Sequence, residues 1–254
     1  MHFSTRPTTL AEIAPLRELY RAEMNCQIMY DSLHTRPGWT QSHLLLADNH
    51  PVGYGTIALA GPWKDKPTTT ELFILPEHRL LIFELFESFL RANNPIAIET
   101  QSNATLLPIM LHTYAKNIAV EAILFHDKIT TTHTQPDVIF RRAMPYDRAQ
   151  MTSQKLDASA DYVLERNGEI LATGGILYHY NPPYGDLFMS VAESHRRRGL
   201  GSFLIQELKR TAYELKHIPA ARCNVDNIPS RKTLQKAGFV PCGNIITGAL
   251  PSLT

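Results

Sequence analysis

The stretch Val191-Ala192-Glu193-Ser194-His195-Arg196-Arg197-Arg198-Gly199-Leu200-Gly201 joins the end of a predicted strand to the start of a predicted helix. The helix is expected over residues 200–216, and its buried face consists of Leu200, Phe203, Leu204, Leu208, Ala212 and Leu215. Unpaired N–H groups at a helix start bind anions, and glycine lets a phosphate oxygen approach the backbone closely. The stretch therefore predicts a pyrophosphate site, whereas a run of three arginines alone would more often be a solvent-exposed turn.

A second motif follows, Asn227-Ile228-Pro229-Ser230-Arg231-Lys232-Thr233-Leu234-Gln235-Lys236-Ala237-Gly238-Phe239. Asn227 can cap a helix, and Pro229 suits the first turn. Gly238 followed by Phe239 suits a left-handed helix end with an apolar anchor. The motif predicts a short helix, and on this pattern alone Asn227 and Ser230 can be caps with no further role.

The two motifs resemble those of the GNAT superfamily of N-acetyltransferases. Arg196-x-x-Gly199-x-Gly201 after a strand ending at Val191 is similar to the acetyl-CoA loop of that family, and residues 227–239 are similar to its second motif. Their order and separation match the family, and the resemblance covers about residues 140–250. It implies that acetyl-CoA is the co-substrate and that an amine, of a small molecule or of a protein, attacks its thioester directly.

The resemblance also implies roles for individual residues. Those expected to contact the pantetheine and the pyrophosphate are Met189, Ser190, Val191, Arg196, Arg197, Arg198, Gly199, Leu200, Gly201, Ser202, Asn227 and Ser230. The candidates for catalysis are Ser230, Asp186 and Tyr178. Asp186 and Tyr178, like His179, lie on or beside strands expected to face the acceptor; a structural role is the alternative for each, and no general base is assigned.

One position departs from the family pattern. Many relatives carry, seven residues after the motif asparagine, a tyrosine that protonates the leaving thiolate, whereas this chain has Leu234. A CoA thiol has a pKa of about 8.5, like that of a free cysteine, so it leaves tolerably well without a dedicated acid. We therefore expect Ser230, one helical turn earlier, to hydrogen-bond the sulfur, and a tyrosine at position 234 to raise turnover.

The two halves of the chain repeat one order of patterns. Val52–Ile57 aligns with Leu171–Ile176, and Glu71–Ile74 aligns with Asp186–Met189. Several matches in the same order indicate an internal duplication. The prediction is an α/β fold (an α+β mixed sheet) with two tandem GNAT-like domains, each a central mixed sheet flanked by helices. They are expected at residues 1–130 and 131–254, with the threonine-rich residues 130–136 as the linker.

The first copy lacks the motifs of the second. Its loop, Pro76-Glu77-His78-Arg79, contains no glycine and runs directly into the helix expected over residues 81–92. Asn103 matches Asn227 in rough position, but Ala104-Thr105-Leu106-Leu107-Pro108 follows it. We interpret residues 1–130 as a degenerate copy that serves packing or shapes the acceptor groove.

Composition bounds the class of protein. The 254 residues include 25 Lys and Arg against 24 Asp and Glu, so a dedicated nucleic-acid or anionic-membrane binder is disfavoured. With 44% hydrophobic and 19% charged residues, an ordinary packed core is expected. Cys26, Cys223 and Cys242 form no ligand pattern, so no metal site is predicted. No export signal or membrane span is recognised, and the expected location is cytoplasmic.

Two other functions remain open at the level of sequence. A non-catalytic acyl-CoA-binding or regulatory module would use the same phosphate loop. A nucleic-acid binder would use Arg196–Arg198 with Arg141, Arg142 and Arg148, but the balanced charge and the lack of interleaved aromatic residues count against it.

Overall fold

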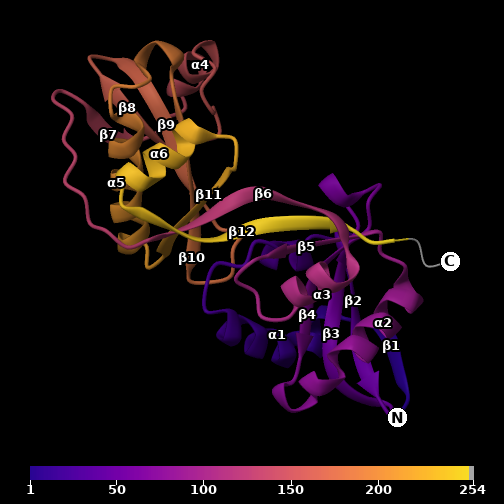
Figure 1. The fold of residues 1–254 in the computed structure, drawn as a ribbon. Helices are drawn as coiled ribbons and strands as arrows, with labels where there is room; N and C mark the ends of the chain where they lie inside the picture. The colour runs from indigo at the N-terminus through magenta and orange to yellow at the C-terminus, as the bar shows by residue number, and fades with distance from the viewer. Residues whose placement is uncertain (252–254) are drawn as a thin grey trace. The chain divides into compact units, whose positions relative to one another are not determined.

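The computed structural model describes residues 1–251, which form two compact units (Figure 1). The first unit comprises residues 1–122 together with the C-terminal segment that begins at Gly243, and the second comprises residues 123–242. Each unit is built on a mixed sheet with helices, which confirms the predicted α/β class. The expected boundary, between residues 130 and 131, differs from this division. It would assign the segment from Gly243 onward to the second unit, whereas this segment belongs to the first.

The first unit contains six strands that are hydrogen-bonded in the order β1-β2-β3-β4-β5-β12. Its elements are β1 (Phe3–Thr8), α1 (Leu10–Met24), η1 (Asp31–Thr35), β2 (Thr40–Ala47), β3 (His50–Ala58), η2 (Gly61–Trp63), β4 (Thr68–Ile74), η3 (Pro76–Leu81), α2 (Ile82–Asn93), β5 (Ala97–Gln101), α3 (Leu107–Tyr114) and the start of β6 (Lys116–Asp127). The end of β12 closes this sheet, because Ile245–Ala249 pairs antiparallel with Ala97–Gln101.

Local signals set the helix ends in the first unit. Thr9 caps α1 by accepting the N–H of Glu12, and Asn25 ends α1 in the left-handed conformation at φ 44°. Asn94 ends α2 in the same way at φ 47°. The helix expected over residues 81–92 therefore forms almost where the pattern places it.

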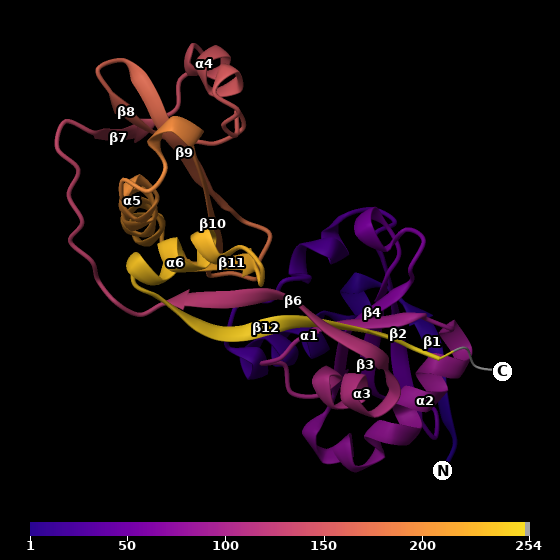
Figure 2. The ribbon, with the colours of Figure 1, turned by 45° about the horizontal axis from the view of Figure 1, so that its top comes forward.

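The second unit contains strands in the order β6-β11-β10-β9-β8-β7 (Figure 2). Its elements are the end of β6, β7 (Ile139–Arg142), α4 (Asp147–Ser153), β8 (Tyr162–Arg166), β9 (Glu169–Leu177), β10 (Tyr184–Val191), η4 (Glu193–His195), α5 (Leu200–Glu214), β11 (Ile218–Asn224), α6 (Ile228–Lys236) and the start of β12 (Phe239–Ala249).

Two apolar clusters cover the sheet of the second unit. The buried face of α5 packs against one side, where its neighbours include Leu187 of β10. Met151 of α4 packs with Phe188, the next residue of β10. Since successive strand residues point to opposite faces, α5 and α4 lie on opposite faces of this sheet. Leu204, Ile205, Leu208 and Ala212 of α5 have no exposed surface, so this helix is firmly seated.

Equivalent arginine side chains bind backbone carbonyls at the strand ends of both units. These contacts confirm the internal repeat and correct the alignment of its two copies. Arg79 Nε donates to the Ile74 carbonyl at 3.1 Å, and Arg196 Nε donates to the Val191 carbonyl at 3.2 Å. Ile74 is thus equivalent to Val191, and the alignment of Glu71–Ile74 with Asp186–Met189 is wrong by two residues. The error arises because apolar alternation has a period of two and tolerates such a shift.

Among the described residues, no helix combines the length and the hydropathy needed to span a lipid bilayer.

Candidate acyl-CoA and acceptor site

The parallel strands β10 and β11 separate about half-way along β10. They pair only at Tyr184↔Ile218, Gly185↔Pro219 and Asp186↔Ala220. Residues 187–191 continue to pair with β9 on the other side. The edge of β10 that faces β11 therefore carries backbone groups with no strand partner beyond Asp186, and such groups can hydrogen-bond an extended ligand.

The loop at the end of β10 leads from this edge into α5. Arg197 and Gly199 both have positive φ, 62° and 82°, and Gly199 is the N-cap of α5. Within residues 1–251, nothing accepts a hydrogen bond from the N–H groups at the start of the helix, those of Gly199, Leu200 and Gly201. These free donors and the positive end of α5 make an anion site, as the sequence predicts.

Gly201 has a second reason to be glycine. A Cβ at this position would lie 3.0 Å from Thr233 Cγ2 of α6 and 3.5 Å from Met189 Sδ of β10. The absence of a side chain at Gly201 thus lets α5 approach both α6 and β10. The predicted site residues Met189 and Gly201 are brought together here.

Two other residues of the predicted loop face inward. Leu200 is 3% exposed and belongs to the core, so only its backbone is available to a ligand. Ser202 is also buried, and its hydroxyl donates to the Thr233 carbonyl at 3.3 Å. The side chains of Leu200 and Ser202 therefore fasten α5, while the arginines at 196–198 line the solvent side of the loop.

The segment of residues 130–136, expected as a linker, belongs to the second unit and lies along α5 and α6 (Figure 2). The His133 N–H donates to Gln206 Oε1 at 2.7 Å, and His133 Nε2 lies 2.7 Å from the Lys236 carbonyl. Gln135 Nε2 donates to the Arg198 carbonyl at 3.0 Å. Sequence reasoning missed Gln135 as a wall of the phosphate loop, because no local pattern signals a contact 63 residues away.

The second motif forms the predicted helix α6. Asn227 Oδ1 accepts the Ser230 N–H at 3.1 Å, so Asn227 is the N-cap. Burial raises the pKa of the Cys223 thiol, against the opposing effects of the Arg231 charge and of a hydrogen bond with the Ser230 hydroxyl. Ser230 therefore lies beside the last residues of β11, on the other side of the gap from β10.

Asp186 lies at the point where β10 and β11 separate, and it is 4% exposed. Its Oδ2 lies 3.1 Å from His179 Nε2 and 3.6 Å from Arg222 Nε. The ring of Tyr180 contacts that of His179 edge-on, and burial followed by the charge of Asp186 raises the pKa of Tyr180 well above its ordinary value. Tyr180 and Arg222 are members of this cluster that the sequence analysis did not single out.

Tyr178 lies elsewhere. It is 57% exposed, and its ring contacts His217 at 4.7 Å between centroids. The structure thus groups Asp186 with His179, whereas the ring of Tyr178 contacts His217. Within the described residues, no set of three or more His, Cys, Asp or Glu side chains is arranged to hold a metal ion.

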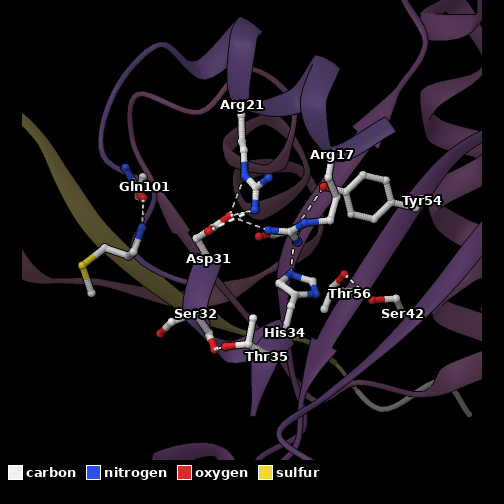
Figure 3. Close-up of polar contacts among 12 residues, drawn as sticks. Arg17, Arg21, Asp31, Ser32, His34, Thr35, Ser42, Tyr54, Thr56 and Gln101 are labelled. Atoms are coloured by element: carbon white, nitrogen blue, oxygen red, sulfur yellow. Dashed lines mark hydrogen bonds and ion pairs between the residues drawn. The ribbon is translucent and has the colours of Figure 1, made fainter. Parts of the chain in front are cut away.

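In the first unit, β4 and β5 also separate after a short paired stretch, but residues of the same unit hydrogen-bond in the space beyond it. β4 and β5 pair only at Thr68↔Ala97 and Thr69↔Ile98. Beyond them, the Gln101 side chain (Figure 3) accepts the Met29 N–H at 2.7 Å. It also donates to the Gln27 carbonyl at 2.8 Å. Residues 76–81 form a short 3-10 helix with no positive φ, so the loop that cradles an anion in the second unit is absent.

The first unit also contains a buried network of charged side chains (Figure 3). Arg17 lies 2.6 Å from Asp31 and 2.7 Å from Glu71, which also receives the Tyr54 hydroxyl at 3.0 Å and lies 3.0 Å from His34 Nε2. Burial alone would raise the pKa of Glu71, but the charges of Arg17 and then His34 overcome it and lower the pKa to about 2. Every carboxylate charge here has a partner, so this network is a structural one.

Comparisons with known proteins bear on the family and the fold. Residues 127–239 match the Acetyltransferase (GNAT) family. A GNAT-family acetyltransferase from Colwellia psychrerythraea has a similar structure, with a TM-score of 0.79 at 14% identity over 99% of this chain and 100% of the other. A GCN5-related N-acetyltransferase from Sphaerobacter thermophilus gives 0.61 at 12% over 99% and 97%. A tandem GNAT protein from the clavulanic acid biosynthesis pathway gives 0.58 at 12% over 99% and 100%. No curated protein matches the chain.

The match defines the class for the C-terminal half: residues 127–239 match the Acetyltransferase (GNAT) family. The chain as a whole has the tandem GNAT fold, because three structures match at least 99% of it. Both predictions from the sequence are confirmed. Members of this family typically use an acyl-CoA and an acyl acceptor.

Proposed function

We propose that the second unit is an N-acetyltransferase that transfers an acetyl group from acetyl-CoA to an amine of a small molecule or a protein. The observation that carries the proposal is the free edge of β10, which leads directly to the open N–H groups at Gly199–Gly201. A strand edge suits an extended pantetheine, and a helix start with glycine suits a pyrophosphate.

Each predicted binding residue has a place in this proposal. The backbone of Met189, Ser190 and Val191 forms the edge along which the pantetheine would lie. The arginines at 196–198 supply positive charge around the phosphates, although Arg196 also holds the end of β10. Asn227 shapes the opposite wall by starting α6, which places Ser230 beside the gap.

Acetyl-CoA supplies an activated acyl group, and the chain must supply a way to remove a proton from the attacking amine. Asp186 and His179 are the groups best placed to do so, because they lie where the two strands separate. We assign proton acceptance to His179 and the positioning of its ring to Asp186. Tyr178 has no role in this scheme, since its ring contacts His217.

Ser230 has the lesser role of hydrogen-bonding the thioester sulfur. The loss of one neutral hydrogen bond is worth about 1 kcal/mol, which is less than tenfold in rate. Ser230→Ala should therefore lower turnover by about tenfold or less, measured by the release of free CoA thiol with any acceptor found. A loss of a thousandfold with intact CoA binding would instead make Ser230 the essential acid.

The test of the function is an acetylation screen of the full chain against a panel of amines, combined with calorimetry of acetyl-CoA. We expect one bound acetyl-CoA per chain, because only the second unit has the open loop. Two sites per chain would refute the assignment of the site. Binding without turnover of any amine, protein amines included, would leave an acyl-CoA-binding module instead of an enzyme.

A further inference from the structure

A separate pocket of about 340 Å³ lies in the second unit, where β7, β8 and β9 meet the end of α5. Its walls include Arg142, Arg148, Asp161, Tyr162, Tyr178 and Leu215. This volume is within the range of small-molecule sites, which runs from roughly 300 to 1,000 Å³. None of these residues belongs to the phosphate loop or to the Asp186 cluster.

The charged groups of this pocket form no close ion pair, although the charge of Arg148 helps to lower the pKa of the neighbouring Asp147. Within residues 1–251, no ion pair involves Arg142, Arg148 or Asp161, and Arg148 donates only to the Ala160 carbonyl at 3.2 Å. The adjacent Arg141 is the opposite case, because Asp147 binds it through two oxygens at 2.7 and 2.9 Å and Glu165 binds it at 2.7 Å. The chain thus neutralises the arginine outside the pocket and leaves the two inside it available to an anion.

The aromatic walls are held in place. Tyr162 is 8% exposed, stacks on Phe140 at 5.2 Å and lies 5.8 Å from the guanidinium carbon of Arg142. Burial, together with the nearby Tyr162 and Asp161, raises the pKa of Tyr178, so its hydroxyl stays a neutral donor. Together with Leu215, these rings give the pocket an apolar wall against which a flat group can pack.

The arginine end of the pocket lies away from the gap between β10 and β11. Arg142 pairs with Tyr162, Tyr162 with Gly174, and Gly174 with Met189, so three strand spacings separate Arg142 from the edge of β10. At about 4.8 Å per spacing, this is about 14 Å. Ile176 of β9, another wall of the pocket, pairs with Leu187 of β10, so only the arginine end of the pocket lies this far from Met189.

We propose that this pocket binds a small zwitterion with an aromatic or apolar body, that is, a molecule of the α-amino acid class. Its carboxylate would bind Arg142 and Arg148, and its ammonium group would bind Asp161. The two arginines and one carboxylate line a single hollow without pairing with each other, so a ligand that bridges them satisfies all three. This inference does not depend on the proposed acetyltransferase activity, and its test needs no turnover.

The test is calorimetric titration of the full chain with three probes that share a phenyl ring: phenylalanine, phenylacetate and phenethylamine. Phenylalanine should bind at least tenfold more tightly than either partial analogue, because only it satisfies both charge types. Arg142→Gln and Asp161→Asn should each weaken phenylalanine binding about tenfold or more, the value of one lost charge-assisted contact. Arg166→Gln, an arginine at the end of β8 outside the pocket, is the matched control and should leave binding unchanged.

Three results would overturn the proposal. They are no binding of phenylalanine by the folded chain, equal binding of phenylacetate and phenylalanine, and equal loss in Arg166→Gln and Arg142→Gln. Saturating acetyl-CoA should leave the phenylalanine affinity unchanged, and competition between them would show that the pocket is part of the transfer site. Failure of the acetylation screen has no bearing on any of these readouts.

Discussion

Two glycines of the phosphate loop are required for different physical reasons, and substitution should separate them. Gly199 has a φ of 82°, and a Cβ there would meet only the end of the flexible Gln135 side chain. Gly201 has ordinary helical geometry, but its Cβ would meet Thr233 and Met189. Strain at Gly199 is thus local, whereas strain at Gly201 is shared with the core between α5 and α6.

We predict that Gly199→Val and Gly201→Val both abolish acetyl-CoA binding. A branched side chain is strained at the positive φ of Gly199 and blocks the approach of a phosphate, and at Gly201 it pushes the start of α5 away from Thr233 and Met189. Gly201→Val should in addition lower the free energy of unfolding by about 1–3 kcal/mol through overpacking. Calorimetry and chemical denaturation measure the two effects. Gly38→Val is the control, since Gly38 also has positive φ, 73°, with open space around it and no part in the loop. Unchanged CoA affinity in both loop variants would contradict the site.

The pair of Asp186 and His179 gives a second prediction at this scale. Asp186→Asn and His179→Gln should each lower kcat/KM about ten- to a thousandfold, in the range of one general base. Because the two residues act as a unit, the double variant should lose about as much as the worse single variant. Steady-state kinetics with an amine identified in the screen measures this, and additive losses would show that the two residues act independently.

At the scale of elements, α6 corrects an expectation from the family motif. Leu234 is 3% exposed and packs in the cluster that holds α5 to the sheet. A tyrosine at this position would have to find room in the core, so it would not simply supply the missing acid. Ser230 beside Cys223 is the polar group that α6 presents near the gap.

We therefore predict that Leu234→Tyr destabilises the chain by about 1–3 kcal/mol, as overpacked cores do, and does not raise turnover. Thermal denaturation together with the rate of CoA thiol release checks both parts. Leu234→Met, which nearly conserves volume, is the matched control and should cost less than about 1.5 kcal/mol. A stable Leu234→Tyr variant with faster turnover would restore the original expectation.

Elements defined by local patterns could be predicted, and those defined by distant contacts could not. The helix expected over residues 200–216 forms as α5 over Leu200–Glu214, because its apolar stripe and its glycine start are both local. The loop and the capping residue Asn227 were found for the same reason. Nothing local shows that residues 245–249 pair with β5, or that Gln135 reaches Arg198. The His179–Asp186 distance likewise depends on the conformation of a loop that the pattern leaves open.

At the scale of the whole molecule, the buried charges of the first unit link folding to pH. The pKa of Glu71 falls to about 2 from an ordinary value of 4.5, so the folded state holds this group ionised more readily than the unfolded state does. A lowered pKa stabilises the protein above the unfolded value, and the contribution is lost as pH falls from about 4.5 towards 2. The shift corresponds to roughly 3 kcal/mol at neutral pH.

We predict that Glu71→Gln lowers the free energy of unfolding at pH 7 by about 3–5 kcal/mol, because Arg17 loses a buried partner. The difference from the parent should shrink as the pH falls from 4.5 towards 2. Denaturant titration over this pH range measures it. Glu87→Gln is the control: it removes the charge of a 3.5 Å surface pair with Arg91 but keeps an oxygen that can accept the Tyr114 hydroxyl, so it should cost no more than about 1 kcal/mol. Equal losses in the two variants would show that the buried network contributes no more than a surface pair.

The return of β12 to the first unit also constrains the order in which the chain becomes complete during translation. When β5 leaves the ribosome, one of its edges has no partner, and an open edge strand pairs readily with other chains. The partner, Ile245–Ala249, is synthesised more than 140 residues later, since Gln101 pairs with Ile245. At about 5–20 residues per second, this interval is roughly 7–30 s. The first unit is therefore synthesised first, but its sheet is complete only after β12 has been made. We expect ribosome-associated chaperones to bind the nascent chain during this interval.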